Sequence, residues 1–299
     1  MSERSEKSKI TALKEIIHSN ENPIPFFVIT ESHLKSRHYD HEIFIEDYTA
    51  LRADRPTIIK GGVIIYLHKD FIMEDKEIYS DEICQAAMVY NSIINLVIIG
   101  IYRPPRADDR SFKACLEKIN TFIDKHEDAD IQMLGDLNFP FIKWKTNEIN
   151  RSNRLTTEIV SAQAMLSFMD QNFLNQMVTE PTRNEPDAIL DLVLTNNTQS
   201  IHSIQIEKTK YSDHNFVWTQ LSYTDLMTIT TNPNHQPDSP LDSLNLIRAD
   251  FDEIRKDLKN IEWEEVLKDK DVEEISALIN ETLIKSCSDH APKHTGTSN

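Results

Sequence analysis

Four apolar segments of this chain each deliver acidic or amide side chains at or near their ends, and this pattern limits the possible folds more than any other feature. Apolar runs of five to eight residues rich in Val, Ile and Phe are typical of buried β-strands. The polar residues at these edges are Glu31, Asp136, Asn138, Asp191, Asp213 and His214. A sheet protein can gather a divalent metal and a phosphate with such groups, so the pattern predicts metal-assisted hydrolysis.

The chain is acidic throughout. Its formal net charge is −17 over 299 residues. Residues 238–299 hold 15 acidic and 8 basic side chains, a net charge of −7, which leaves −10 on the rest. This balance argues against tight nonspecific binding to nucleic acid, which depends on Lys and Arg neutralising phosphates. It still permits a polyanionic substrate, because a bound metal and a few local Arg residues can invert the field in a cleft.

Cysteine usage and hydropathy indicate an intracellular protein of the nucleus or cytoplasm. The three cysteines form no CxxC pair, which argues against a zinc site, a disulfide framework and a disulfide-linked partner. The first twenty residues are polar and charged, unlike a signal peptide. The longest apolar run, residues 96–102, is too short to span a membrane.

The periodicity predicts an α/β protein with many strands and few helices. Helical spacing of apolar residues occurs at 9–19, 111–125, 155–173, 249–260 and 271–287. Strand-like runs occur at 24–30, 43–48, 62–68, 84–90, 93–102, 130–135, 189–195, 201–207 and 215–222. We therefore expect a layered α/β sandwich in which helices cover two β-sheets. We expect domain boundaries at 1–223, a linker at 224–247 that includes the Pro/Asn-rich run 230–240, and a C-terminal helical extension at 248–299.

Each candidate residue has a structural interpretation beside the chemical one. Asp136 and Asn138 can orient a water and hold a phosphate oxygen, or they can form an ordinary turn after a strand. Glu31 suits a magnesium ion, or it can sit in the first turn of a helix that Thr30 caps. Tyr102 can donate its hydroxyl to a phosphate, or it can pack at the sheet edge.

Asp191 and His214 form the most specific expectation. Asp191 interrupts the otherwise apolar run 189–194, where an unpaired carboxylate is costly. We therefore expect a partner, and His214 is the candidate, because an imidazolium can also stabilise developing negative charge on a phosphate. The alternatives are a solvent-facing Asp191 and a surface turn at Asp213-His214. No other histidine has ligand-like spacing.

The order Glu, Tyr, Asp-x-Asn, Asp, Asp-His resembles the endonuclease/exonuclease/phosphatase superfamily. The local sequence is similar to the endonuclease domain of LINE-type retrotransposons, which lack long terminal repeats, over about residues 4–222. The segments that carry this resemblance are FVITESHL, RADRPTIIKGGVIIYLH, IGIYRPP, MLGDLNFPFIKW, VTEPTRNEPDAILDLVLTN and YSDHNFV. Residues 248–283 are similar to the connector that precedes a reverse transcriptase in such elements.

The resemblance implies a four-layered α/β sandwich, two facing mixed sheets flanked by helices, and a role for each matching position. Glu31 matches the metal-binding glutamate and Tyr102 the phosphate-contacting tyrosine. Asp136 matches the aspartate that orients or deprotonates water, and Asn138 matches its companion. Asp191 matches the aspartate that pairs with the family histidine, here His214. Asp213 matches an acidic residue near the metal, which would be Mg²⁺ or Mn²⁺.

One departure concerns the first strand of the family, which carries a phosphate-positioning Asn. Residues 4–10 (RSEKSKI) fit the segment that follows this strand, so Ser2 stands at the Asn position and the strand is expected to be truncated. The prediction is a magnesium-dependent phosphodiesterase that nicks DNA. The alternatives are a catalytically dead remnant that acts as a binding or structural domain, and a superfamily phosphatase with a small phosphorylated substrate.

Overall fold

The computed structural model describes residues 3–18, 20, 23–35, 37–56, 60–105, 107–185, 187–222, 250–268 and 270–290. The chain divides into two compact units, residues 1–228 and 229–299. The predicted linker at 224–247 and the Ser2 position lie outside the described residues. No described helix is long and apolar enough to cross a membrane.

The larger sheet of the first unit has six strands in the order β10-β13-β7-β6-β5-β4. Their bounds are β10 (Asn175–Gln176), β13 (Asp191–Thr195), β7 (Asp130–Asp136), β6 (Leu96–Tyr102), β5 (Gln85–Asn91) and β4 (Asp75–Ser80). Only β6 and β7 run parallel, because α2 (Asp109–Asp124) carries the chain back between them. Every residue of β6 is buried, as expected for a strand that is covered on both faces.

The smaller sheet has three antiparallel strands in the order β1-β3-β2. They are β1 (Phe26–Thr30), β3 (Val63–His68) and β2 (Tyr48–Ala53). The central strand β3 is wholly buried, whereas all five residues of β1 are only partly buried. Among the described residues, β1 pairs along one edge only, so the prediction of a buried strand at 24–30 is correct for the strand and wrong for its burial.

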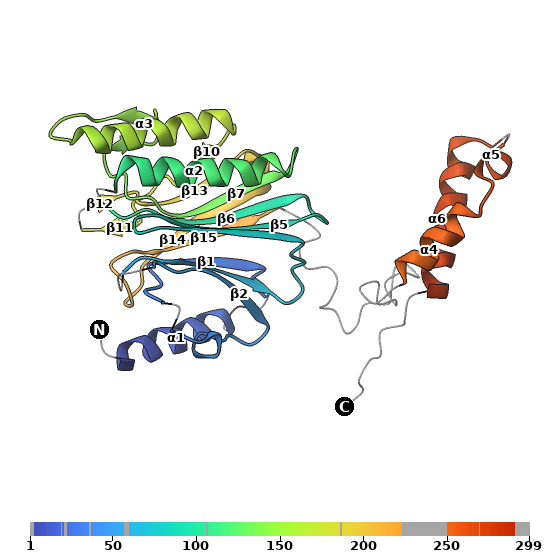
Figure 1. The fold of residues 1–299 in the computed structure, drawn as a ribbon, viewed down its shortest axis with the longest axis horizontal. Helices are drawn as coiled ribbons and strands as arrows, with labels where there is room; N and C mark the ends of the chain where they lie inside the picture. Colours follow the sequence, from blue (N-terminus) through green and yellow to red (C-terminus); the bar gives the residue numbers. More distant parts are fainter. Residues whose placement is uncertain are drawn as a thin grey trace. The chain divides into compact units, whose positions relative to one another are not determined.

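Helices cover the outer faces of both sheets and create four layers (Figure 1). Apolar residues of α2 and α3 (Thr156–Gln171), such as Phe112 and Met165, form one core with the larger sheet. A second core lies between the sheets and includes Ile65 and Ile98. A third core contains Ile17 of α1 (Glu3–His18) and Tyr66 of the smaller sheet. The predicted four-layered sandwich is therefore confirmed.

The remaining elements are hairpins and short helices. The hairpins are β14-β15 (Ile201–Glu207, Phe216–Leu221), β8-β9 (Ile142–Lys143, Glu148–Ile149) and β11-β12 (Arg183–Asn184, Asp187–Ala188). The 3₁₀ turns are η1 (Asp40–Glu42) and η2 (Thr198–Ser200). The second unit contains α4 (Phe251–Lys259), α5 (Trp263–Val266) and α6 (Val272–His290), of which α4 and α6 contact each other.

Most predicted elements are present, but one strand was placed wrongly, and β4 and the two-residue strands β8 to β12 were missed. The run 43–48 is largely loop, and the strand begins at Tyr48 instead. β4 was not predicted, because its sequence DKEIYS is mostly polar on an edge strand. Cys84 and Cys115 are buried free thiols, and Cys287 is also free.

Candidate active site

The strand register of the larger sheet brings three predicted residues into one row. Tyr102 at the end of β6 lies opposite Asp136 on β7, and Asp136 lies opposite Asp191 on β13. Residues that face each other across a strand pair project from the same side of the sheet, with Cβ atoms about 5 Å apart. Tyr102 and Asp136 are 34 positions apart in the sequence, and Asp136 and Asp191 are 55 apart. They meet because their strands pair in this register.

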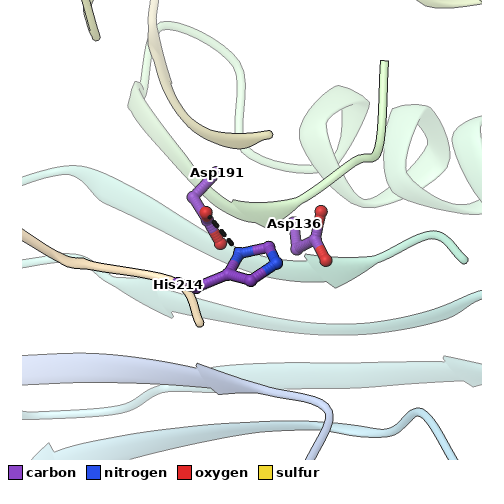
Figure 2. A group of neighbouring side chains, drawn as sticks. All are labelled: Asp136, Asp191 and His214. Carbon is purple, nitrogen blue, oxygen red and sulfur yellow. Dashed lines mark hydrogen bonds and ion pairs between the residues drawn. The ribbon is translucent and has the colours of Figure 1, made fainter. Parts of the chain in front are cut away.

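His214 adds an imidazole to this row from the segment that precedes β15. Its Nδ1 lies 2.7 Å from Oδ2 of Asp191, so the expected pairing of these two residues is present. Figure 2 shows the ring between Asp191 and Asp136, with its other nitrogen on the Asp136 side. Ligand atoms of these three side chains lie within 4.8 Å of one another.

A buried threonine holds both members of this pair in place. Thr182 is fully buried, and its Oγ1 accepts the backbone N–H groups of Leu190 and Asp191 at 3.1 and 3.0 Å. The backbone C=O of Thr182 accepts the N–H of Asn215 at 2.7 Å, next to His214. This residue was not predicted, although it lies within the VTEPTRN segment.

Glu31 approaches the row from the smaller sheet. It follows β1 with a positive φ of 52°, and its Oε1 accepts the Tyr102 hydroxyl at 2.6 Å. Its Oε2 lies 3.5 Å from Nε2 of His33. The hydrogen bond between Glu31 and Tyr102 thus connects the two sheets. His33 also lies at the site, although its spacing in the sequence did not predict this.

Asn138 and Arg103 fix the turn that carries Asp136. Asn138 adopts a left-handed φ of 50°. Its Nδ2 donates to Oδ1 of Asp136 at 2.7 Å and to the C=O of Arg103 at 3.0 Å. Arg103 is 1% exposed; its backbone N–H donates to the C=O of Asp136 at 2.9 Å, and its Nη1 donates to the C=O of Leu137 at 3.1 Å. Asn138 therefore orients the Asp136 carboxylate, while its proposed contact with phosphate stays a prediction.

The Arg103 guanidinium lies over two aromatic rings instead of facing solvent. Its Cζ is 4.1 Å from the Phe139 ring centroid and 5.2 Å from that of Phe112. Burial lowers the pKa of Arg103 to about 10. Its Nε and Nη2 have no hydrogen-bond partner, so cation–π attraction to the two rings replaces part of the lost solvation.

Asp213 lies apart from the buried cluster. Its carboxylate is two-thirds exposed, and its Oδ2 accepts from Nη2 of Arg183 at 2.7 Å. Arg183 also forms a backbone bridge with His214. The predicted metal role of Asp213 stays a prediction. To bind a metal, the carboxylate would have to break its ion pair with Arg183 or use its other oxygen.

Burial and charge shift the protonation of the site in opposite directions. Burial, followed by the nearby Asp191 charge, raises the pKa of Asp136 to about 7. The hydrogen bond that His214 donates to Asp191 raises the pKa of His214 to about 9. The His33 imidazole beside Oε2, and then the hydrogen bond from Tyr102, lower the pKa of Glu31 to about 2 despite its partial burial. At neutral pH the metal-free site thus holds an ionised Glu31, a protonated His214 and an Asp136 that is close to half-ionised.

This donor set fits a hard divalent cation. Carboxylate oxygens are the ligands that Mg²⁺ prefers, and Glu31 stays ionised over the physiological pH range because its pKa is lowered. Asp136 and Asp191 repel each other in a buried row, and a nearby cation would relieve this repulsion. The residues present therefore fit the predicted metal.

Comparisons with known proteins agree with this fold. Residues 96–218 match the family described as endonuclease-reverse transcriptase. No curated protein matches the chain. A 3′-5′ exonuclease from Neisseria meningitidis has the same fold, with a TM-score of 0.54 at 12% identity over 72% of this chain and 95% of that one. An AP endonuclease from Leishmania major gives a TM-score of 0.51 at 12% identity over 72% and 83%.

The endonuclease domain of TRAS1, a telomere-specific non-LTR retrotransposon, also aligns, with a TM-score of 0.48 at 14% identity over 72% of this chain and 89% of that one. The matched residues 96–218 contain Tyr102, Asp136, Asn138, Asp191 and His214. The predicted resemblance to the endonuclease/exonuclease/phosphatase superfamily is confirmed by the family match and the fold.

Proposed function

We infer that this chain, with the fold of the endonuclease/exonuclease/phosphatase superfamily and a segment matching its endonuclease-reverse transcriptase family, is a metal-dependent phosphodiesterase that nicks DNA. The observation that carries this proposal is the row of Tyr102, Asp136 and Asp191, completed by His214 and Glu31. Such a row provides a proton acceptor, a cationic hydrogen-bond donor and an ionised carboxylate around one point.

Asp136 is the proton acceptor in this proposal. In the metal-free protein its pKa is raised to about 7 by burial and by Asp191, and a bound cation would lower it and so keep the carboxylate ionised as a proton acceptor. The water oxygen forms a bond to phosphorus while the bond from phosphorus to the leaving oxygen breaks. The water proton passes to Asp136, whose orientation Asn138 fixes through two hydrogen bonds to Oδ1.

His214 stabilises the charge that develops on the phosphate. Its Nδ1 is occupied by Asp191, so Nε2 carries the proton that a phosphate oxygen can accept. The raised pKa of His214 keeps this nitrogen protonated at neutral pH. A donor fixed in advance for the developing charge is usually a large contribution to catalysis.

Glu31 is the residue that would hold the metal, with Asp213 as a second ligand in the proposal. When bound, the metal supplies Lewis-acid stabilisation of the phosphate and of the leaving oxygen. Tyr102 holds Glu31 through its hydroxyl, and the pKa of Tyr102 is raised by burial and by Glu31. Tyr102 therefore stays a hydrogen-bond donor over the whole working range.

Relaxation of supercoiled plasmid tests this proposal. The chain is expected to nick plasmid in Mg²⁺ or Mn²⁺ and to leave it intact in EDTA. A Glu31→Gln variant should lose nicking while it keeps its thermal unfolding transition, because the side chain is about half exposed. The matched control is Glu117→Gln, at an exposed carboxylate of α2.

The outcomes separate the competing functions. Nicking that persists in EDTA would reject the metal role of Glu31. A folded protein without nicking that hydrolyses a small phosphomonoester would be a superfamily phosphatase. A folded protein without either activity would be the inactive remnant, acting as a binding or structural domain. The resemblance of six sequence segments to LINE-type endonucleases supports DNA as the substrate.

A further inference from the structure

A run of positive charge follows the active-site turn of this acidic chain. Residues 143–154 contain the basic side chains Lys143, Lys145, Arg151 and Arg154 and only one acidic side chain, Glu148. All four basic residues are exposed. In a chain with a net charge of −17, such a run is a local reversal of the field.

The hairpin β8-β9 that carries this run is anchored to the turn that holds Asp136. The N–H of Ile142 donates to the C=O of Phe139 at 3.2 Å, and the N–H of Asn150 donates to the C=O of Phe141 at 2.9 Å. Phe141 and Ile142 are buried. The charged side chains therefore extend from a fixed base.

The positive charge is largely free of neutralising partners. Lys145 and Arg151 have no ionic partner among the described residues, and Lys143 lies 3.5 Å from the exposed Glu148. The Arg154 guanidinium lies 4.8 Å from the Phe141 ring centroid, which orients it while its charge stays available. A charge that is fixed and unpaired is suited to a polyanionic partner.

A groove between this hairpin and α3 extends the surface. Its volume is about 700 Å³, and it is lined by two basic side chains (Lys143 and Arg151), four amide or hydroxyl side chains, two apolar side chains and one carboxylate, Glu148. Arg, Lys, amide and hydroxyl groups are the side chains that bind the sugar–phosphate backbone of nucleic acids. The composition of the groove matches that chemistry.

We propose that residues 143–154 bind the phosphate backbone of duplex DNA beside the bond that is cut. The inference rests on the proposed function, which supplies the scissile bond at Asp136. Lys145 is seven residues from Asn138, so it lies at most about 25 Å away. At about 3.4 Å per base-pair step, this surface reaches phosphates within roughly seven steps of the cut.

The test is binding of a short fluorescent duplex in EDTA, where no bond is cut. The charge-reversal variant Lys145→Glu/Arg151→Glu should bind at least tenfold more weakly. Its slope of log K against log salt should fall by about two, since each lost phosphate contact removes about 0.9. The neutral variant Lys145→Gln/Arg151→Gln should show a smaller loss in the same direction.

The matched control is Lys69→Glu/Lys76→Glu. Both residues are exposed, and they lie at the ends of β3 and β4 opposite to the ends near Glu31 and Tyr102. This variant carries the same change in net charge, so it should bind the duplex like the original chain. Thermal unfolding of each variant verifies that it is folded.

The inference is overturned if the chain does not bind the duplex, or if the reversal variant binds as tightly and with the same salt slope. It is also overturned if the same variants instead lose binding to single-stranded RNA or to anionic vesicles. Hydrolysis of bis(p-nitrophenyl) phosphate in Mg²⁺ tests the proposed function alone. If the chain binds duplex through this surface but does not hydrolyse the diester, the binding inference holds and the proposed enzymatic function is rejected.

Discussion

At the scale of single residues, the two neighbouring carboxylates dominate the energetics of the site. Burial and the Asp191 charge raise the pKa of Asp136 from 3.8 to about 7. A carboxyl whose pKa is raised on folding costs stability as pH rises above its unfolded value, and this cost is complete above the folded value. The ionised Asp136 carboxyl of the metal-free protein therefore costs stability at pH 8, and the protonated carboxyl does not at pH 3.

The variant Asp136→Asn should remove this cost. In EDTA at pH 8 its Tm is expected to exceed that of the original chain, and at pH 3 the two should be nearly equal. Hydrolysis should fall about 10²–10⁴-fold, because the proton acceptor is lost. Thermal unfolding followed by circular dichroism measures the first effect, and plasmid nicking measures the second. A lower Tm than the original chain at pH 8 would contradict the assigned repulsion.

A second prediction concerns the His214–Asp191 pair. His214→Ala and Asp191→Ala should each reduce nicking, and the double variant should be little worse than His214→Ala alone, because Asp191 acts through His214. The matched control is His290–Asp257 in the second unit, which has the same 2.7 Å contact. Alanine at both control positions should leave nicking unchanged. Fully additive losses at 191 and 214 would mean that the two residues act separately.

The role of a single residue was predictable where the sequence placed a charged side chain in an apolar run, because such a side chain needs a partner. Asp191 stands in an apolar run, which demands a buried partner, and His214 meets that demand at 2.7 Å. Arg103 gave no such signal, because a charged residue after a strand is normally exposed. Its burial depends on Phe112 and Phe139, and their positions follow from helix packing and a turn that local periodicity does not encode.

At the scale of elements, β1 is the strand with the least protection. Its four apolar residues and Thr30 are all partly exposed, and it pairs only with β3 among the described residues. The N–H of His68 donates to the C=O of Pro25. In this register the backbone N–H and C=O groups of odd-numbered β1 residues point toward β3, and those of even-numbered residues point away from it. Among the described residues no strand pairs with the outward edge, and N–H groups at such an edge favour association with another strand.

Hydrogen exchange should show this alternation. The amides of Phe26, Val28 and Thr30 should exchange faster than those of Phe27 and Ile29, because only the latter donate to β3. The central strand β3, which pairs on both edges, is the internal control and should be protected throughout. Equal protection along β1 would mean that its outer edge is covered.

Spacing between the sheets depends on Gly100 of β6. A Cβ at this position would lie 3.0 to 3.2 Å from side-chain atoms of Val28, Ile65 and Val63. Gly100→Ala should therefore destabilise the fold by about 1–3 kcal/mol, the usual cost of overpacking. The double variant Gly100→Ala/Val28→Ala should recover part of the loss in urea unfolding. No difference between the single and double variants would show that the smaller sheet shifts freely.

Element type was predictable from periodicity, and edge strands were not. The helices α2, α3 and α6 have the expected apolar spacing and lie within a few residues of the predicted ranges. β4 has a polar sequence because one of its edges is unpaired in the larger sheet. The run 43–48 has strand-like residues, yet Ile43 and Ile45 are buried in a loop against α1 and the smaller sheet, so apolar content alone mispredicts it.

At the scale of the whole molecule, the residues of the proposed site lie in the first unit. All predicted site residues and the three described core clusters lie within residues 1–228. The second unit has its own stabilising contacts, such as Ile254, which is 5% exposed, and the bond between His290 and Asp257. The second unit also carries much of the negative charge, since residues 238–299 contribute −7 of the total of −17.

A protein consisting of residues 1–228 should therefore keep its cooperative unfolding and nick plasmid at least as fast as the full chain. Removing seven net negative charges lowers the long-range repulsion of DNA, so the gain should be largest at low salt and should disappear near physiological ionic strength, where the Debye length is about 8 Å. Initial nicking rates of both proteins over a salt series give the measurement. A shortened protein that unfolds without cooperativity, or that nicks more slowly at every salt concentration, would show that the second unit contributes to the fold or to the active site.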